Sequence, residues 1–271
     1  MKNIILTIIA VLTVSFSALA ANIGTESGTS YTTSTWVNGA SSSVGTWELF
    51  GDSGTRQVVN AGVTNTISYS PSFAISDSTQ GGRASIGSSA FTLGIPNSYN
   101  AFSKAMFTFG GGALTSGQSV SFDLNFLWSG GKRGFAFQDA SGSALFGAFH
   151  EWSDPLVAYL GGLSANTTAL SSAYQKAVTV SASLLNSTVN WTIYEKGGST
   201  ALINTSSSLG VGQDIAKIYF YAGDNQDMGA DVNNFNMSIN NINVVPEPSS
   251  SVLMGLGLAG LAVLRRNRKN S

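Results

Sequence analysis

The only histidine of this 271-residue chain lies in a short segment that holds several catalytic residue types. His150, Glu151, Ser153 and Asp154 fall within five positions and are the residue types of a hydrolytic site. Members of a catalytic triad normally come from separate parts of a chain and meet after folding, so this crowding carries little weight. Glu151 and Asp154 also have the wrong spacing for one strand face, because side chains alternate along a strand. We therefore expect a polar strand end or loop, with a hydrolase using His150, Glu151 or Asp154 as the alternative.

A second polar segment is rich in oxygen ligands. Asp224, Asn225, Asp227 and Asp231 supply three carboxylates and an amide between two predicted strands. Such a loop can coordinate calcium, which takes six to eight hard oxygen ligands, but it lacks the residue order of an EF-hand. We expect a solvated turn rather than a bound cofactor, and we keep these four residues as the best candidate for a metal or glycan site.

The five tryptophans are candidates for stacking on sugar rings, because an indole face offers apolar area beside a polar edge. We interpret Trp36 and Trp47 as exposed rings. Trp128 and Trp191 fall on the apolar faces of predicted strands, so we expect them in the core. Trp152, beside His150 and Glu151, is the ring that we nominate for a surface role.

Charge and cysteine content exclude several classes of site. Between residues 22 and 245 there are eight basic and thirteen acidic residues, which gives this part a net charge of −5. It lacks the basic stripe that binding a phosphate backbone requires, so nucleic acid is not an expected partner. The absence of cysteine excludes disulfides, a thiolate nucleophile and a cysteine-ligated zinc site.

The elements that must position these residues are strands. Apolar residues alternate with polar ones along 119–128, 178–184 and 189–193, the period of a strand with one buried face. The last two runs predict a hairpin with a turn near Ser187 and Thr188. Further strands are expected at 47–50, 64–70, 101–109, 134–138, 144–149, 216–222 and 235–245. In the last of these the apolar parity switches, which predicts a bulge near Asn240 and Asn241.

Frequent Gly, Ser and Asn turns between these strands predict an all-β fold with an antiparallel β-sandwich over residues 21–245. No repeat of 20–50 residues is found, which argues against a propeller or solenoid. In their general pattern, though in no specific motif, the long alternating strands and the aromatic core resemble a concanavalin-A-like, lectin-like jelly roll. An immunoglobulin-like sandwich or another jelly roll remains open. Glycosidases of the lectin-like fold carry a Glu-x-Asp-x-x-Glu strand, which does not occur in this sequence.

The N-terminal residues have the three parts of a secretory signal. Lys2 gives a positive start, residues 4–16 are apolar, and Ala18 and Ala20 are the small residues that signal peptidase recognises. We expect a signal helix over residues 1–20 and cleavage between Ala20 and Ala21. An uncleaved membrane anchor is the alternative, although the apolar run is shorter than the ~20 residues that spanning favours.

The C-terminal tail, residues 246–271, has three features in a fixed order. Pro246, Glu247 and Pro248 come first, the apolar residues 252–264 follow, and a basic cluster occupies 265–269. As a helix the apolar part spans about 20 Å, short of the ~30 Å hydrocarbon core. The basic cluster lies where the positive-inside rule expects the cytoplasmic side. We therefore predict a short transmembrane helix at 252–264.

This tail resembles the PEP-CTERM sorting signal. The resemblance implies that Pro246, Glu247 and Pro248 are recognised by exosortase, a membrane processing enzyme, after transient anchoring in the inner membrane. It also implies export, delivery to the cell surface or beyond, and a role with exopolysaccharide in a biofilm or matrix.

Our leading hypothesis is therefore a non-enzymatic, exosortase-sorted surface protein that contacts carbohydrate. A secreted polysaccharide hydrolase and a structural surface protein without a ligand are the alternatives.

Overall fold

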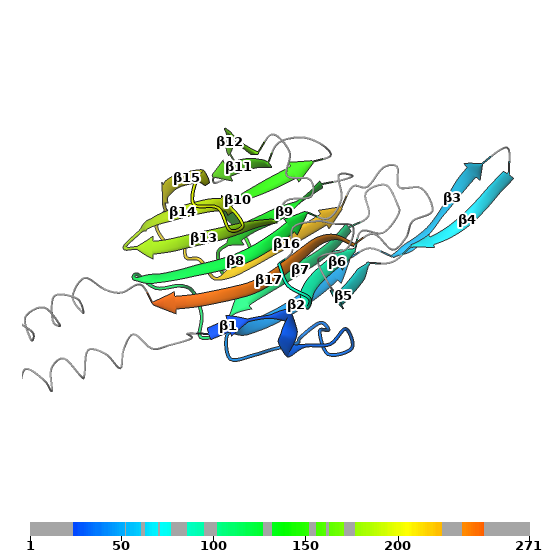
Figure 1. The fold of residues 1–271 in the computed structure, drawn as a ribbon, viewed down its shortest axis with the longest axis horizontal. Helices are drawn as coiled ribbons and strands as arrows, with labels where there is room; N and C mark the ends of the chain where they lie inside the picture. Colours follow the sequence, from blue (N-terminus) through cyan, green and yellow to red (C-terminus); the bar gives the residue numbers. More distant parts are fainter. Residues whose placement is uncertain are drawn as a thin grey trace, which may run out of the picture.

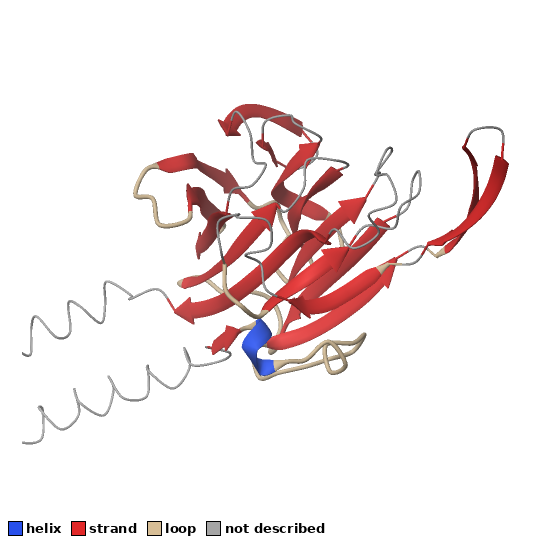
Figure 2. Cartoon of the chain, turned by 45° about the vertical axis from the view of Figure 1, so that its right-hand side comes forward, coloured by secondary structure: helices blue, strands red, loops and turns tan. Residues whose placement is uncertain are grey.

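The computed structural model describes residues 24–51, 53–60, 63–69, 71–76, 86–94, 102–126, 132–151, 156–160, 163–170, 177–223 and 235–246. Most of these residues form strands, and the helix described among them is the short 3₁₀ helix η1 (Gly28–Ser30) (Figure 2). The predicted signal segment and the predicted membrane helix at 252–264 lie outside the described residues. In the part of the chain that is described, no helix has the length and apolarity needed to cross a membrane.

Two antiparallel sheets make up the body of the fold (Figure 1). Sheet A has the order β15-β14-β13-β8-β17-β6-β5, and β1 also pairs with β17. Its strands are β1 (Gly24–Glu26), β5 (Ser72–Ser76), β6 (Ala90–Gly94), β8 (Gln118–Phe126), β13 (Ala177–Leu185), β14 (Thr188–Glu195), β15 (Ala201–Ser208) and β17 (Phe235–Pro246).

Sheet B has the order β12-β11-β10-β9-β16-β7-β2. Its strands are β2 (Gly45–Gly51), β7 (Phe102–Phe109), β9 (Lys132–Gln138), β10 (Ala144–Glu151), β11 (Leu156–Leu160), β12 (Leu163–Leu170) and β16 (Lys217–Gly223). A separate hairpin of β3 (Gly54–Asn60) and β4 (Val63–Tyr69) projects away from the two sheets (Figure 1).

The facing sides of the two sheets form one aromatic core, which confirms the predicted antiparallel sandwich. Phe122 of sheet A packs edge-on against Phe135 of sheet B, with ring centroids 5.2 Å apart. Trp191 of sheet A lies 5.4 Å from Phe146 of sheet B. Trp191 is fully buried, as its place in the alternating pattern predicted. The sandwich is therefore stabilised by burial of aromatic rings together with aliphatic side chains, at roughly 25 cal/mol per Å² removed from water.

The interpretation of Trp36 and Trp47 as exposed rings is wrong. Trp36 is 1% and Trp47 0% exposed, and their rings meet edge to face at 5.5 Å. Trp47 also lies 4.7 Å from Phe91, which belongs to the other sheet. These two indoles are buried in the core beside the edge strand β2, so they are not available to stack on a ligand. Trp128 and Trp152 lie outside the described residues.

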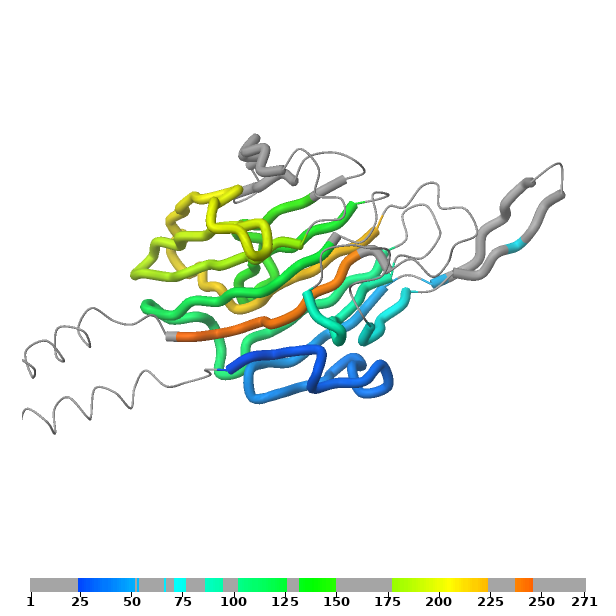
Figure 3. Tube along the Cα trace, viewed as in Figure 1, coloured from blue at the N-terminus to red at the C-terminus, as the bar shows by residue number. Residues whose placement is uncertain are grey.

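The first and last described strands run side by side. Strand β1 pairs with β17 in the register Gly24 to Val244, so the start of β1 and the C-terminal part of β17 lie at the same end of the sandwich (Figure 3). The hairpin β3–β4 projects at the opposite end (Figure 1). The first and the last described residues therefore lie at one end of the fold.

Candidate functional site

The two polar segments predicted from the sequence begin at neighbouring strand ends. Glu151, the last residue of β10, and Gly223, the last residue of β16, both pair with Lys132 of β9. His150 lies one position before Glu151 on β10. Trp152, Asp154, Asp224, Asn225, Asp227 and Asp231 lie outside the described residues. Among the residues that are described, no group of three or more His, Asp or Glu side chains could hold a metal ion.

The sorting and cleavage residues fall mostly beyond the described part. Pro246 is the last residue of β17 and pairs with Gln118 of β8, so the Pro-Glu-Pro motif starts where the sandwich ends. Glu247, Pro248, Ala18, Ala20 and Ala21 lie outside the described residues. Because proline has no backbone N–H, Pro246 can contribute only its carbonyl to the hydrogen bonding of that strand.

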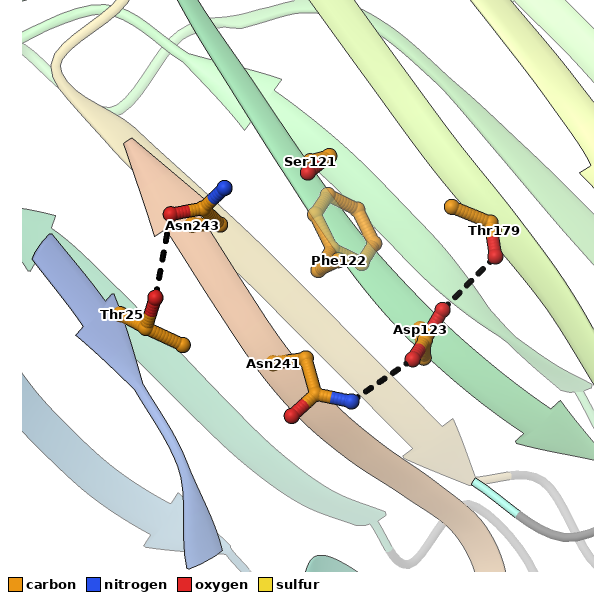
Figure 4. A pocket seen from close by; sticks show the side chains of 7 residues that line it. All are labelled: Thr25, Ser121, Phe122, Asp123, Thr179, Asn241 and Asn243. Carbon is orange, nitrogen blue, oxygen red and sulfur yellow. Dashed lines mark hydrogen bonds between the residues drawn. The ribbon is translucent and has the colours of Figure 1, made fainter. Parts of the chain in front are cut away.

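A polar hollow of about 300 Å³ lies on the outer face of sheet A. We call it the Asp123 pocket; it is lined by Thr25, Ser121, Phe122, Asp123, Thr179, Asn241 and Asn243 (Figure 4). These residues come from β1, β8, β13 and β17, which are neighbours in the sheet. Apart from Phe122, every lining side chain carries a hydroxyl, amide or carboxylate group. The pocket is therefore a place where hydrogen-bonding groups from four strands converge.

Asp123 is the centre of this network. Its side chain is nearly buried, at 6% exposure. Its Oδ1 accepts a hydrogen bond from Thr179 Oγ1 at 2.7 Å, and its Oδ2 accepts one from Asn241 Nδ2 at 2.8 Å (Figure 4). Lys196 Nζ forms an ion pair with the same Oδ2. The single carboxylate that lines the pocket is thus neutralised by a lysine and held by two neutral donors.

A β-bulge aims Asn241 into the pocket. The pairing of β17 with β8 shifts register between Asn240 and Asn243, and Asn241 has a φ of 53°. The bulge expected from the parity switch is therefore confirmed. Bulges re-aim side chains and are over-represented beside functional sites. Asn is also one of the few non-glycine residues that adopts this left-handed backbone readily.

Asn240, the buried residue that precedes Asn241, holds the bulge in place through hydrogen bonds. It is 3% exposed, and its Oδ1 accepts a hydrogen bond from the backbone N–H of Gly28 at 3.1 Å. Its Nδ2 donates to the carbonyl of Ile86 at 2.9 Å. One buried amide thus ties together η1, the segment before β6 and the last strand, which fixes the backbone from which Asn241 projects.

At the outer rim of the Asp123 pocket, Thr25 Oγ1 donates a hydrogen bond to Asn243 Oδ1 at 3.1 Å (Figure 4).

The sequence alone did not identify the Asp123 pocket. Asp123 lies on the polar face of an alternating strand, where it looks like any solvent-facing residue. Its partners Thr179, Lys196 and Asn241 lie 56 to 118 residues away in sequence. The one feature of the local sequence that pointed to this site was the switch in apolar parity within β17.

The sequence tail matches a known family model. Residues 244–269 match the PEP-CTERM protein-sorting motif. The motif implies processing by an exosortase and sorting to the cell surface. No curated protein sequence matches the chain.

Several solved structures align with parts of the chain. The VIP36 exoplasmic/lumenal domain in its Ca²⁺/Man2-bound form aligns with a TM-score of 0.44 and 8% identity, over 80% of this chain and 86% of that one. The alginate lyase from Corynebacterium sp. aligns with a TM-score of 0.40 and 12% identity, over 73% and 93%. Similarity at this level assigns no ligand to the chain. The chain is thus an all-β protein, with an antiparallel sandwich followed by the PEP-CTERM protein-sorting motif.

Proposed function

We propose that this protein is an exported, exosortase-sorted component of the bacterial surface or extracellular matrix, and that its sandwich, of the lectin-like type, binds neutral glycan in the Asp123 pocket. The protein enters the secretory route through a signal peptide, and the inner membrane holds it until processing. The exopolysaccharide of a biofilm is the expected partner. The observation that carries the binding step is the convergence of hydroxyl, amide and carboxylate groups in one hollow.

The chemistry of the pocket fits a sugar with uncharged hydroxyl groups. Asn, Asp and Thr side chains exchange hydrogen bonds with hydroxyls because they offer both donors and acceptors. The pocket volume lies at the lower end of the range of about 300–1,000 Å³ for small-molecule sites, which suits one sugar unit of a longer chain. Lys196 cancels the charge of Asp123, so the site needs no charge on its ligand.

We further propose that the protein acts without catalysis. Glycoside hydrolysis requires two carboxyl groups facing each other across the scissile bond. Asp123 is the one carboxylate among the residues that line the pocket, and its oxygens are already engaged by three donors. An incubation of the protein with polysaccharides tests this. Cleavage that disappears in Glu151→Gln would establish the hydrolase alternative instead.

Glycan binding can be tested on the full chain, purified in mild detergent. Titration with dextran and other neutral polysaccharides should show saturable binding, and Asn243→Ala should weaken it about tenfold through the loss of one well-placed polar partner. Asn190→Ala is the matched control, because Asn190 is an exposed asparagine on β14 of the same sheet, outside the pocket. Equal affinities for the two variants would overturn the assignment of the pocket.

Delivery needs its own test. Replacing Pro246, Glu247 and Pro248 with alanine should block processing in a bacterium that carries an exosortase, and the longer, membrane-held form should accumulate. If the triple variant is processed and released like the native chain, the exosortase step is wrong.

A further inference from the structure

The outer face of sheet B carries aromatic rings and lysines instead of the small polar groups of sheet A. Because side chains alternate along a strand, the residues between the buried ones on β2, β7 and β16 point outward. The group that we call the aromatic–lysine face consists of Phe50, Phe102, Lys104, Tyr219 and Tyr221. Phe50 is 40% exposed and the other four side chains are partly exposed.

Strand register places these side chains next to one another. Phe50 of β2 pairs with Lys104 of β7, and Lys104 pairs in turn with Tyr221 of β16. Phe102 stacks with Tyr221 at 6.4 Å between ring centroids, and Tyr219 stacks with Tyr221 at the same distance. Four rings on three adjacent strands therefore surround one lysine.

The ammonium group of Lys104 lies among aromatic rings, whereas a surface lysine commonly lies near a carboxylate. Its Nζ lies 3.8 Å from the centre of the Phe102 ring and 5.7 to 5.9 Å from those of Phe50, Tyr219 and Tyr221. Within the described part of the chain it forms no ion pair. Lys132 repeats the arrangement on β9, with its Nζ 5.7 Å from the Phe149 ring. The Lys104 ammonium is held over an aromatic face and keeps its charge available for an anion.

The charge of this face is opposite to that of the protein. The part between residues 22 and 245 has a net charge of −5. The outward side chains that are described on sheet B include Lys104, Lys132 and Lys217, with Glu48 as the one acid among them, and strand register places Glu151 opposite Lys132. Positive charge and aromatic rings are thus gathered on one side of an otherwise acidic protein.

We propose that the aromatic–lysine face is a second glycan-binding surface, and that its ligand is an acidic polysaccharide built from uronic acid units. Phe50, Phe102 and the two tyrosines offer flat apolar area to the C–H faces of pyranose rings. Lys104 and Lys132 pair with sugar carboxylates through charge-assisted hydrogen bonds. A nucleic-acid strand fits less well, because it needs a continuous positive groove along its backbone.

This surface lies on the opposite side of the sandwich from the Asp123 pocket, so one molecule can hold two polymers. Linking two sites in one molecule raises overall avidity without any new contact. The inference goes beyond neutral-glycan binding and does not depend on it, because the two surfaces share no residue.

The test measures the affinity of the full chain for polygalacturonate, with dextran and single-stranded DNA as comparisons. Lys104→Gln should weaken polygalacturonate binding about tenfold by removing one charge-assisted contact. Lys104→Arg keeps the charge and should stay within about threefold of the native affinity. Lys217→Gln is the matched control, because it removes the same charge from the outer face of the same sheet, and among the described residues no aromatic ring lies under its ammonium.

Three results would overturn the proposal. The first is no binding of polygalacturonate, and the second is an equal loss of polygalacturonate affinity in Lys104→Gln and Lys217→Gln. The third is binding of single-stranded DNA as strong as that of polygalacturonate, if Lys104→Gln also removes it. The last two would show attraction by net charge alone. If Lys104→Gln melts far below the native protein, Phe102→Leu replaces it, since leucine keeps apolar contact and removes the ring. Asn243→Ala should leave polygalacturonate binding unchanged, so a failure of this proposal is distinguishable from a failure of the Asp123 pocket.

Discussion

Replacing Asn241 by glycine and by alanine separates the two roles of this residue at the bulge. Both changes remove the amide that donates to Asp123 Oδ2 at 2.8 Å. Alanine also lacks the polar side chain that lets asparagine adopt the φ of 53°, so it carries the left-handed cost of roughly 1–2 kcal/mol, which glycine avoids because it has no Cβ. The pair of variants therefore distinguishes lost hydrogen bonding from backbone strain.

The magnitudes follow from the contacts. A hydrogen bond to a charged group contributes about 1.5–3 kcal/mol, and the lower value applies because Thr179 and Lys196 still hold Asp123. Glycine adds about 0.5 kcal/mol through the greater freedom of the unfolded chain. We expect Asn241→Gly to lower the free energy of unfolding by about 2 kcal/mol. Asn241→Ala should lower it by about 3 kcal/mol.

Urea unfolding followed by tryptophan fluorescence measures both values. Asn190 on β14 is the matched control, because its backbone has no positive φ. There the order should invert, with alanine more stable than glycine, since glycine inside a strand is the costlier residue. If Asn241→Ala is as stable as Asn241→Gly, the left-handed bulge that aims the amide into the pocket is refuted.

Three further predictions concern stability. Asn186, in the turn between β13 and β14, has a φ of 56°, so Asn186→Ala should melt below Asn186→Gly in calorimetry, and the reverse order would contradict this turn geometry. Glu26 is 1% exposed and accepts hydrogen bonds from Trp47 Nε1 at 2.9 Å and from Ser42. Glu26→Ala should lower the free energy of unfolding in urea by about 3 kcal/mol, and Glu26→Gln should lower it by less than half of that. Equal decreases in the two variants would show that the hydrogen bonds contribute nothing. Burial raises the pKa of Tyr219, so its phenol stays neutral in the folded state while the unfolded chain ionises above about pH 10. Stability should therefore fall as pH rises beyond that point, and Tyr219→Phe should reduce the fall in melting temperature; an unchanged alkaline slope would contradict the burial of the hydroxyl.

Alternation in sequence was sufficient to predict the strands that have one buried and one open face. β7, β13 and β16 all show it, and the hairpin of β13 and β14 was placed correctly. The turn residues are Asn186 and Ser187, one position earlier than expected. The parity switch in β17 predicted its bulge because one extra residue exchanges the two faces of a strand.

The local sequence of other strands does not indicate that they are strands. Every residue of β6 is buried, so no alternation marks it. β1 has three residues and depends on a partner more than 200 positions away. β12 and β15 are rich in Ser, Thr and Asn, and their sequences resemble the turns of this chain. Propensity could not identify them because pairing with neighbouring strands decides their conformation.

The candidate sites were less predictable than the fold. Residues that crowd together in sequence, such as His150, Glu151 and Asp154, attracted attention for that reason. The Asp123 pocket and the aromatic–lysine face instead join residues from strands far apart in the chain. Each depends on strand register, which only the folded sheet defines. Outward-facing Lys104 or Asp123 looks in sequence like an ordinary exposed residue.

The central claim is that an exosortase delivers this protein to a polysaccharide matrix, where the Asp123 pocket holds it. The most direct measurement is the distribution of the protein among inner membrane, matrix and medium in a matrix-forming bacterium that carries an exosortase. The native chain should be found in the matrix, Asn243→Ala should shift into the medium, and the variant with alanine at Pro246, Glu247 and Pro248 should stay in the inner membrane. If Asn243→Ala remains in the matrix in the same proportion as the native chain and Asn190→Ala, the pocket does not hold the protein there.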